Sequence, residues 1–337
     1  MKYVCPLTTA LLAAVHLASI IMPVSSKAAE LKKIAIMPKT LVNDVFQIRY
    51  VEAAEREAKK EGVATERFAS RNYLAVEDQI NVIEALISRG EFGALILDPI
   101  DAKSMANILD KASKAGIFVI LVDSLVEKGE YVSAITTDNK GAAASGGDFV
   151  ASLVGKKGNV AMLEGEPGGS TAADRKNGFK EAIAKYPDIH LVASLNGHWT
   201  LPGGVESTEA LIAEHKDLDA IFTCSDMMGI GARQVLEKAA QKAKEAGDNA
   251  QAERFKEVKI VGFDGVTEGF KAVKDGRFSA TVAQMPETMG MRSVEIAVQL
   301  MKSEKKPGDF PKFIDSGATI ITKENVDEVA SKLGLKL

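Results

Sequence analysis

Short apolar runs alternate with segments of helical periodicity from Leu31 onward. Ten runs have the length and composition of β-strands, and they span 33–37, 63–69, 94–97, 118–122, 132–135, 160–163, 190–194, 220–223, 259–263 and 280–283. Amphipathic helices are predicted over 46–61, 76–89, 102–115, 141–153, 172–185, 204–214 and 230–244, with one long solvated helix through 238–256. This alternation predicts an α/β fold with parallel sheets, and the length of 337 residues predicts two domains.

The first 28 residues have a different character. Lys2 precedes an apolar stretch centred on residues 11–21, and small residues flank Lys27 at the end of the segment. A membrane anchor needs about 18 to 20 continuous apolar residues, whereas polar residues and a proline interrupt this run. We therefore predict a secretory signal peptide that is cleaved after Ala28. Cleavage removes two lysines and no acidic residue, so the net charge changes from −4 to −6.

The composition excludes several classes of function. A chain with 46% hydrophobic and 26% charged residues is typical of a globular protein, and no basic cluster indicates nucleic-acid binding. After signal cleavage only Cys224 remains, so no intramolecular disulfide can form, and its apolar surroundings predict a buried thiol. The three remaining histidines have no second metal ligand at a useful spacing, so we predict neither a metal nor a cofactor.

A glycine-rich loop, Gly165-Glu166-Pro167-Gly168-Gly169-Ser170, follows one of the predicted strands. It lacks the Lys-Ser/Thr ending of a P-loop and the spacing of G-x-G-x-x-G, and its carboxylate would repel phosphate. We therefore do not predict nucleotide binding at this loop. No G-x-S-x-G nucleophile elbow is present either.

Four carboxylates follow the apolar runs of predicted strands: Asp98, Asp123, Asp226 and Asp264. The carboxyl ends of parallel strands meet in one crevice, where α/β sheets bind their ligands. For each aspartate the alternative is a helix cap or an Asx-turn. Asp98 precedes Pro99 and is predicted to be a turn residue, and Asp226 is predicted to cap the helix that follows it. Asp123 and Asp264 are the candidates for ligand binding.

Other candidate binding residues combine aromatic and polar character. Lys39, Asn43 and Phe46 belong to the loop and helix start after the first strand, Arg175 begins a later helix, and Trp199 is the only tryptophan. Aromatic rings stack on the apolar faces of sugar rings, while Asp, Asn, Gln and Arg hydrogen-bond hydroxyls. The set therefore indicates a neutral polyhydroxylated ligand, although a packing role is an equal alternative for Trp199.

Several motifs together resemble one known family, the periplasmic sugar-binding proteins of the ribose-binding type, which serve ABC importers. These motifs are Val122-Asp123, Thr137-Asp138-Asn139, Arg175 with Gly178-Phe179, Val261-Gly262-Phe263-Asp264-Gly265 and Ala280 to Pro286. The resemblance covers nearly all of the chain after Leu31. It implies a type I fold: two Rossmann-like lobes, each a parallel sheet flanked by helices, joined by a three-stranded hinge. We place the first lobe at 29–137 plus 285–316 and the second at 138–284 plus 317–337.

The resemblance also implies which residues bind the ligand: Lys39, Asn43, Phe46, Asp123, Ser124, Arg175, Trp199, Ser225, Phe263, Asp264 and Gln284. Trp199 falls where the family carries a stacking aromatic. Ser124 and Ser225 stand where ribose binders carry an arginine and an asparagine, and Lys39 and Val45 replace a serine and a phenylalanine. The lost donors argue against ribose and favour another pentose, a hexose or a sugar alcohol, and Lys39 could reach a hydroxyl or even an acidic group.

The implied protein is a monomeric periplasmic receptor that closes over a monosaccharide or polyol and delivers it to an ABC permease. A chemoreceptor is a second candidate partner, and no catalytic residue is predicted. Two alternatives remain open. One is the effector-binding half of a sugar-responsive regulator, which would need a helix-turn-helix where this chain has a signal peptide. The other is an exported or cytosolic α/β enzyme that acts on a sugar and uses Asp123 or Asp264 as acid or base.

Overall fold

The structure is a computed structural model of the chain, and it describes residues 1–3, 31–42 and 44–337. The predicted signal peptide, its cleavage site and Asn43 lie outside the described residues. No helix in the described part is long and apolar enough to cross a membrane.

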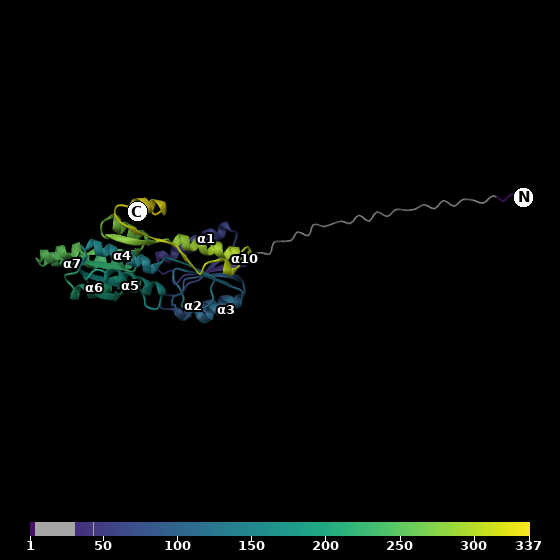
Figure 1. The fold of residues 1–337 in the computed structure, drawn as a ribbon, viewed down its shortest axis with the longest axis horizontal. Helices are drawn as coiled ribbons and strands as arrows, with labels where there is room; N and C mark the ends of the chain where they lie inside the picture. Colours follow the sequence, from purple (N-terminus) through teal and green to yellow (C-terminus); the bar gives the residue numbers. More distant parts are fainter. Residues whose placement is uncertain (4–30, 43) are drawn as a thin grey trace. The chain divides into compact units, whose positions relative to one another are not determined.

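The first lobe is built on a sheet of six parallel strands in the order β11-β5-β4-β3-β1-β2. The strands are β1 (Lys33–Met37), β2 (Thr65–Arg67), β3 (Phe92–Leu97), β4 (Phe118–Val122), β5 (Ser133–Thr136) and β11 (Phe313–Asp315). Its helices are α1 (Val45–Lys60), α2 (Val76–Arg89), α3 (Ala106–Lys114) and α10 (Pro286–Met301). Helices α1 and α10 pack together over one face, and α2 and α3 cover the other (Figure 1).

The second lobe has a six-stranded sheet in the order β12-β10-β9-β8-β6-β7. The strands are β6 (Lys157–Glu164), β7 (Asp188–Asn196), β8 (Ala220–Thr223), β9 (Lys259–Asp264), β10 (Ala280–Gln284) and β12 (Ala318–Ile321). Only the β10–β12 pair within this sheet is antiparallel. The helices are α4 (Asn139–Leu153), α5 (Ser170–Ile183), α6 (Leu201–Glu214), α7 (Asp226–Glu245), α8 (Asn249–Glu257), α9 (Thr267–Lys274) and α11 (Val326–Lys332).

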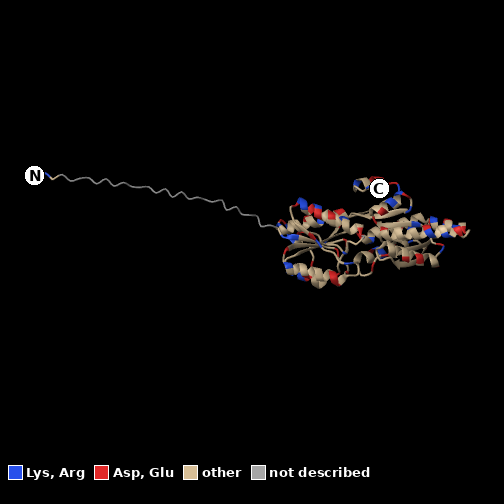
Figure 2. Ribbon diagram, turned by 180° about the vertical axis from the view of Figure 1, so that it is seen from behind, with Lys and Arg blue, Asp and Glu red and all other residues tan. Residues whose placement is uncertain are grey.

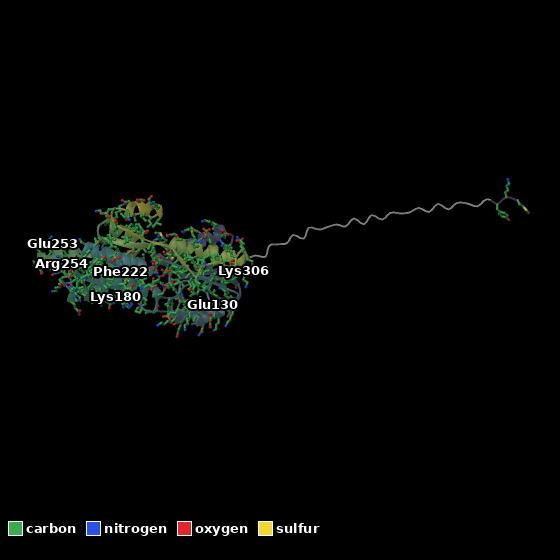
Figure 3. The ribbon with its side chains drawn as sticks, in the orientation of Figure 1. Glu130, Lys180, Phe222, Glu253, Arg254 and Lys306 are labelled. Atoms are coloured by element: carbon green, nitrogen blue, oxygen red, sulfur yellow. The ribbon has the colours of Figure 1, made fainter. Side chains whose placement is uncertain are left out.

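Burial explains why the apolar runs form these sheets. Every residue of β3 and β8 is buried, as expected for strands covered by helices on both faces. In the second lobe the rings of Phe179 and Phe222 stack with centroids 4.5 Å apart between α5 and β8, and Figure 3 marks Phe222. Lysines, arginines and acidic residues are interspersed over the helices of residues 31–337 (Figure 2).

The chain passes between the two sheets three times: from β5 to α4, from β10 to α10 and from β11 to β12. Two α/β lobes with mostly parallel sheets confirm the predicted fold class. The lobe boundaries that we place in these connections remain a prediction.

The structure has two strands and three helices that were not predicted, β11, β12, α9, α10 and α11, and it divides one predicted polar segment between two helices. Strands β11 and β12 have only three and four residues and are largely exposed, so they lack an apolar run. Helix α10 was not predicted; it buries residues on several sides because it contacts α1 and the strands of the first sheet. The polar segment 238–256 forms the end of α7 and the separate helix α8, because Gly247, with φ +83°, breaks the helix between them.

Candidate ligand-binding cleft

A cavity of about 910 Å³ lies at the carboxyl ends of strands from both sheets. Eight of the predicted binding residues line it: Lys39, Phe46, Asp123, Arg175, Trp199, Ser225, Asp264 and Gln284. Phe46 lies on the first turn of α1 and is 7% exposed. Ser124 and Phe263 do not line the cavity; each lies behind a residue that does. The cavity therefore gathers side chains that are far apart in the sequence.

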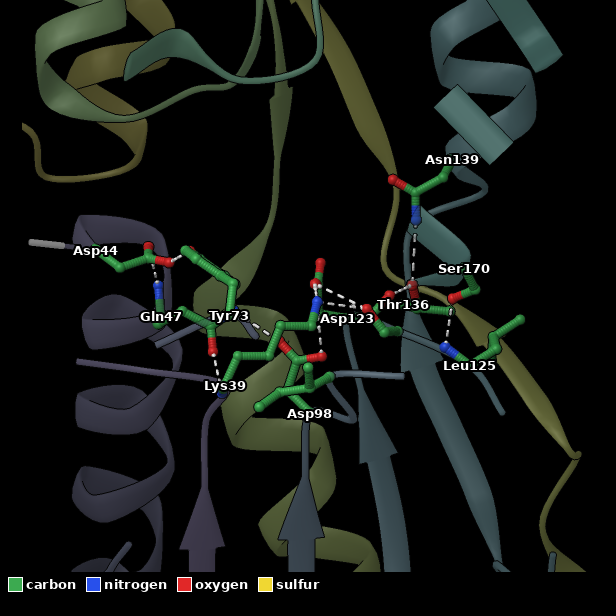
Figure 4. Close-up of polar contacts among 12 residues, drawn as sticks. Lys39, Asp44, Gln47, Tyr73, Asp98, Asp123, Leu125, Thr136, Asn139 and Ser170 are labelled. Atoms are coloured by element: carbon green, nitrogen blue, oxygen red, sulfur yellow. Dashed lines mark hydrogen bonds and ion pairs between the residues drawn. The ribbon is translucent and has the colours of Figure 1, made fainter. Parts of the chain in front are cut away.

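The Lys39 ammonium group is surrounded by acceptors of the first lobe (Figure 4). Its Nζ lies 3.1 Å from Asp98 Oδ1, 3.2 Å from Asp123 Oδ2 and 2.6 Å from Ser124 Oγ. The three acceptors follow β3 and β4, and β3 lies between β4 and β1 in the sheet order. Ser124 thus accepts a hydrogen bond from Lys39 and does not itself line the cavity.

Asp98 is not the turn residue that we predicted. Its side chain is fully buried, where it pairs with Lys39 and accepts a 2.6 Å hydrogen bond from Gln47 Nε2. Gln79 holds the following turn instead, donating to the Asp98 carbonyl and accepting from Ile100 N. The prediction was wrong because the proline after Asp98 indicates a turn but carries no information about a partner on another strand.

Asp123 has a left-handed backbone conformation, with φ 59°. Two hydrogen bonds hold Asp123 in this conformation. The Asp123 amide donates to the Ile135 carbonyl at 3.1 Å, and the Asp123 carbonyl accepts from the Thr136 hydroxyl. While Oδ2 contacts Lys39, no described residue hydrogen-bonds the buried Oδ1 atom. A buried acceptor without a partner is costly in the unliganded protein, so Oδ1 is available to a ligand donor.

Asp44 and Tyr73 were not predicted to belong to this site. Asp44 caps α1 by accepting a 3.0 Å bond from Gln47 N, and the Tyr73 hydroxyl donates to the same carboxylate (Figure 4). Both residues line the cavity. Asp44 begins a helix after the first strand, a position that could have identified it, but Tyr73 lies in the loop before α2, which has no distinguishing pattern.

Arg175 organises the second-lobe side of the cleft. Its Nε donates to Asn139 Oδ1 at 2.8 Å, and its Nη1 donates to the Cys224 carbonyl at 2.7 Å and to Asp264 Oδ1 at 2.9 Å. The guanidinium group lies 3.8 Å from the centroid of the Phe263 ring. Phe263 is fully buried, so its role in this geometry is to support Arg175 rather than to face the cavity.

Trp199 lies in the loop between β7 and α6, 5.5 Å from the Arg175 guanidinium carbon. Its backbone is left-handed, with φ 62°, and its indole ring packs so closely on Gly165 that a Cβ there would collide with the ring. The glycine-rich loop therefore provides the surface on which the indole ring rests. Non-glycine residues in this conformation are uncommon and cluster at functional sites.

Asp264 and Gln284 complete the second-lobe side. Asp264 Oδ1 accepts from Gln284 Nε2 at 2.9 Å in addition to Arg175, and the Asp264 backbone has φ 108°. Gln284 Oε1 is buried without a hydrogen-bond partner among the described residues. It is a second acceptor that a ligand in the cavity could satisfy.

The prediction that Asp226 caps the helix that follows it was wrong. Ser225 is the N-cap of α7 and accepts from Met228 N, although it also lines the cavity. The buried Asp226 carboxylate accepts from the amides of Gly265 and Val266, each at 2.9 Å, and from the Thr281 hydroxyl at 2.6 Å. It thereby holds the turn that immediately follows Asp264.

Burial dominates the ionisation of the acidic groups here. It raises the pKa of Asp264 to about 6, although the Arg175 charge opposes it, and that of Asp44 to about 7. Burial also raises the pKa of Asp98, against the Lys39 charge. For Lys39, burial acts to lower the pKa, but Asp98 and Asp123 outweigh it and raise the pKa. The buried part of the cleft thus holds Lys39 and Arg175 among four carboxylates, and Arg71, which pairs with Asp78 and is largely exposed, also lines the cavity.

The described residues support neither metal binding nor a thiol nucleophile. They contain no group of three or more His, Cys, Asp or Glu side chains that could hold a metal ion. Cys224 is buried as predicted, and burial raises the pKa of its thiol to about 12, far from that of a nucleophile.

Two lobes with a polar cleft at the strand ends are typical of solute-binding proteins. Residues 34–306 match the family described as periplasmic binding protein domain. The chain belongs to the periplasmic binding protein family, which confirms the resemblance seen in its motifs.

Curated relatives include a ribose import binding protein of Haemophilus influenzae, 34% identical over 303 residues, covering 90% of this chain and 96% of the relative. A xylitol-binding protein of Mycolicibacterium smegmatis is 31% identical over 253 residues, covering 75% of this chain and 67% of the relative. A solved periplasmic solute-binding protein of an ABC transporter from Actinobacillus succinogenes, with bound D-allose, has a TM-score of 0.77 and 26% identity, covering 88% of this chain and 99% of that chain. These relatives are solute-binding proteins, which confirms the prediction that the chain is not an enzyme.

Proposed function

We propose that this protein is a periplasmic receptor that binds a monosaccharide or sugar alcohol between its lobes and delivers it to an ABC import permease. The observation that carries the proposal is that one cavity contains both buried acceptors without a hydrogen-bond partner and aromatic side chains. Asp123 Oδ1 and Gln284 Oε1 lack partners among the described residues, and Trp199 and Phe46 line the same space.

Hydroxyl groups match these acceptors better than other small polar groups do. A hydroxyl donates one hydrogen and accepts others, so neighbouring hydroxyls can donate to Asp123 and Gln284 while accepting from Arg175. Nε and Nη1 of Arg175 are occupied, which leaves Nη2 for the ligand. Bonds to charged partners are the stronger ones, so Asp123, Arg175 and Asp264 would contribute most of the polar binding energy. Phe46 and Trp199 would contact the carbon skeleton.

The relatives support the class of ligand and the transport role. Their names refer to ribose import, to xylitol and to bound D-allose, so neutral polyhydroxylated ligands recur among proteins similar to this chain. Export by the predicted signal peptide would bring the receptor to the periplasm. A permease, and in a second role a chemoreceptor, would recognise the monomeric receptor in its closed form.

The test of the function is a thermal-shift screen of the mature protein against pentoses, hexoses, polyols and sugar acids. A ligand that binds only the folded state raises the melting temperature by mass action. At a ligand concentration of 100 times the Kd, the free energy of unfolding increases by about 2.7 kcal/mol. We expect at least one neutral sugar or polyol to give a concentration-dependent shift and to be recovered unchanged. A screen without a neutral ligand, or a sugar that is chemically converted, would contradict the proposal.

Contacts between the lobes outside the cavity indicate how closure is stabilised. The glycine-rich loop reaches the first lobe twice: Ala102 N donates to the Gly168 carbonyl at 3.1 Å, and Leu125 N donates to Ser170 Oγ at 2.7 Å (Figure 4). Arg49 of α1 also donates to the Gly265 carbonyl at 2.8 Å. In our proposal these bonds form on closure and favour the ligand-bound state.

We expect Ser170→Ala to weaken ligand binding about threefold to tenfold through faster dissociation, because one bond that stabilises closure is lost. The melting temperature of the unliganded protein should stay nearly the same. Stopped-flow binding by Trp199 fluorescence, with the best ligand of the screen, measures the change. Ser152→Ala is the matched control, since that hydroxyl donates to Phe149 O at 2.7 Å within α4 and makes no contact between lobes. Equal dissociation rates for the two variants would contradict the role of Ser170.

A further inference from the structure

Lys39 is the one residue whose predicted role as a ligand contact conflicts with its surroundings. Its side chain is 6% exposed, although the residue lines the cavity. An ammonium group has three N–H donors. Three acceptor oxygens, on Asp98, Asp123 and Ser124, lie within 3.2 Å of Nζ. The ammonium group therefore donates hydrogen bonds to Asp123 and Ser124 and forms an ion pair with Asp98, all within the protein.

The partners of Lys39 are themselves held in place. Gln47 donates to Asp98 Oδ2 at 2.6 Å, and its carbonyl oxygen accepts from the backbone amide of Lys39 at 3.1 Å. Lys39, Asp98 and Gln47 thus form a closed ring across β1, β3 and α1. A rotation of Nζ toward the cavity would leave two buried carboxylates without their cation, at a high cost in free energy.

We infer that Lys39 is a positioning residue: it holds Asp123 by Oδ2 so that Oδ1 faces the ligand, and the cleft consequently selects neutral polyhydroxylated ligands over sugar acids. The inference deepens the proposed function and rests on it for the class of ligand. It replaces the expectation that Lys39 reaches a hydroxyl or an acidic group of the ligand.

The charges around the cleft agree with this role. The titratable groups that face Lys39 and Asp123 are Asp98 after β3, Asp44 and Tyr50 of the α1 segment, and Asp264 from the second lobe. Lys39 is the cation that offsets the first-lobe carboxylates, and Arg175 is already paired with Asp264. Because Lys39 is occupied, an anionic ligand could pair only with Nη2 of Arg175 or with Arg71, which lines the cavity but pairs with Asp78. It would also face the carboxylates of Asp44, Asp123 and Asp264, whereas a hydroxyl can donate to Asp123 Oδ1.

Lys39→Met tests the positioning role, because it keeps the length of the side chain but removes its charge and donors. With xylitol and D-ribose as probes, we expect an affinity loss of about tenfold or more at pH 7. The loss arises because the Asp123 carboxylate loses the contact at Oδ2 that orients it. A purely structural role would lower the melting temperature of the unliganded protein but leave the affinity of the folded variant unchanged. Lys302→Met is the matched control, because Lys302 pairs with Glu61 on the surface of the same lobe.

Xylonate distinguishes positioning from direct contact. It differs from xylitol by a terminal carboxylate, so a lysine that touches the ligand would favour it. We expect the wild-type protein to bind xylonate at least tenfold more weakly than the better of the two neutral probes. Equal or tighter binding of xylonate would overturn the inference, as would a Lys39→Met variant with an unchanged affinity.

Two further measurements keep the test decisive if Lys39→Met does not fold or no probe binds. Ser124→Ala removes one acceptor of Lys39 from behind the cavity wall, and we expect it to weaken binding about threefold to tenfold; unchanged binding would count against the inference. Crystal structures of the unliganded variants need no ligand, and the Asp123 carboxylate should turn from its wild-type orientation in Ser124→Ala and, more strongly, in Lys39→Met. An unmoved Asp123 carboxylate overturns the inference, whereas a failed sugar screen alone contradicts only the proposed function.

Discussion

Replacing Asp264 with asparagine should weaken sugar or polyol binding by about 10- to 100-fold while leaving the unliganded melting temperature nearly unchanged. The variant keeps an oxygen that can accept from Arg175 and Gln284, but it removes the charge that strengthens bonds to ligand hydroxyls. A hydrogen bond to a charged group contributes about 1.5–3 kcal/mol, and each 1.4 kcal/mol is a tenfold change in affinity. Alanine is a poorer choice, because it would leave the buried Arg175 and Gln284 without the oxygen that accepts their hydrogen bonds. Isothermal titration calorimetry measures the loss.

The same carboxyl determines the expected pH dependence. Burial raises the pKa of Asp264 from 3.8 to about 6, so ligand affinity should decline as the pH falls through about 6, and Asp264→Asn should flatten this decline. Its effect on the unliganded protein has the opposite sign: a carboxyl with a raised folded pKa costs stability as the pH rises from about 4 to 6. Asp275→Ala, at an exposed position of the same lobe, is the control. An affinity within threefold of wild type would place the ligand away from Asp264.

Asp226→Ala should have the largest effect on stability, about 3–5 kcal/mol in the free energy of unfolding. The substitution leaves two backbone amides and the Thr281 hydroxyl buried without their acceptor, and each unsatisfied group costs about 1–3 kcal/mol. Alanine also leaves a void, because Gly262 and Gly269 give the carboxylate space that a Cβ on either would occupy. Urea unfolding followed by Trp199 fluorescence, which reports on the second lobe, measures the loss.

Asp226→Asn is the matched control for this prediction. Its side-chain oxygen can accept from Gly265 and Val266, and its amide can donate to Thr281 once that hydroxyl rotates. We therefore expect the asparagine variant to retain more than half of the stability that alanine loses. Equal losses in the two variants would show that negative charge, rather than hydrogen bonding, holds the turn after Asp264.

The fold could be predicted from the sequence because its determinants are local. Runs such as Phe118–Val122 are apolar throughout, since helices cover both faces of the sheet, and the helices between them repeat every three to four residues. The elements that were missed either depend on a neighbour or are too short to have a pattern. Strand β12, for example, exists because it pairs with β10, and three of its four residues are not buried.

The candidate site could be predicted only in part. Residues directly after strands, such as Asp123 and Asp264, are identifiable because parallel strands end at one edge of a sheet. Tyr73 and Asp44 belong to the cavity because a loop and a helix start lie close together in space. No spacing in the sequence relates these two residues, so their pairing appears only in the structure.

By itself the sequence determined the two-lobed α/β class, the absence of a catalytic motif and most of the polar and aromatic residues of the cleft. Only the tertiary structure decided what each charged side chain does. Lys39 meets Asp123, 84 residues away, because β1, β3 and β4 are neighbours in the sheet, and this order makes an apparent ligand contact into a buried support. Asp226 serves the turn after Asp264 for the same reason. The free energy of a buried charge depends on the atoms that surround it, and those atoms come from strands that the chain order does not place together.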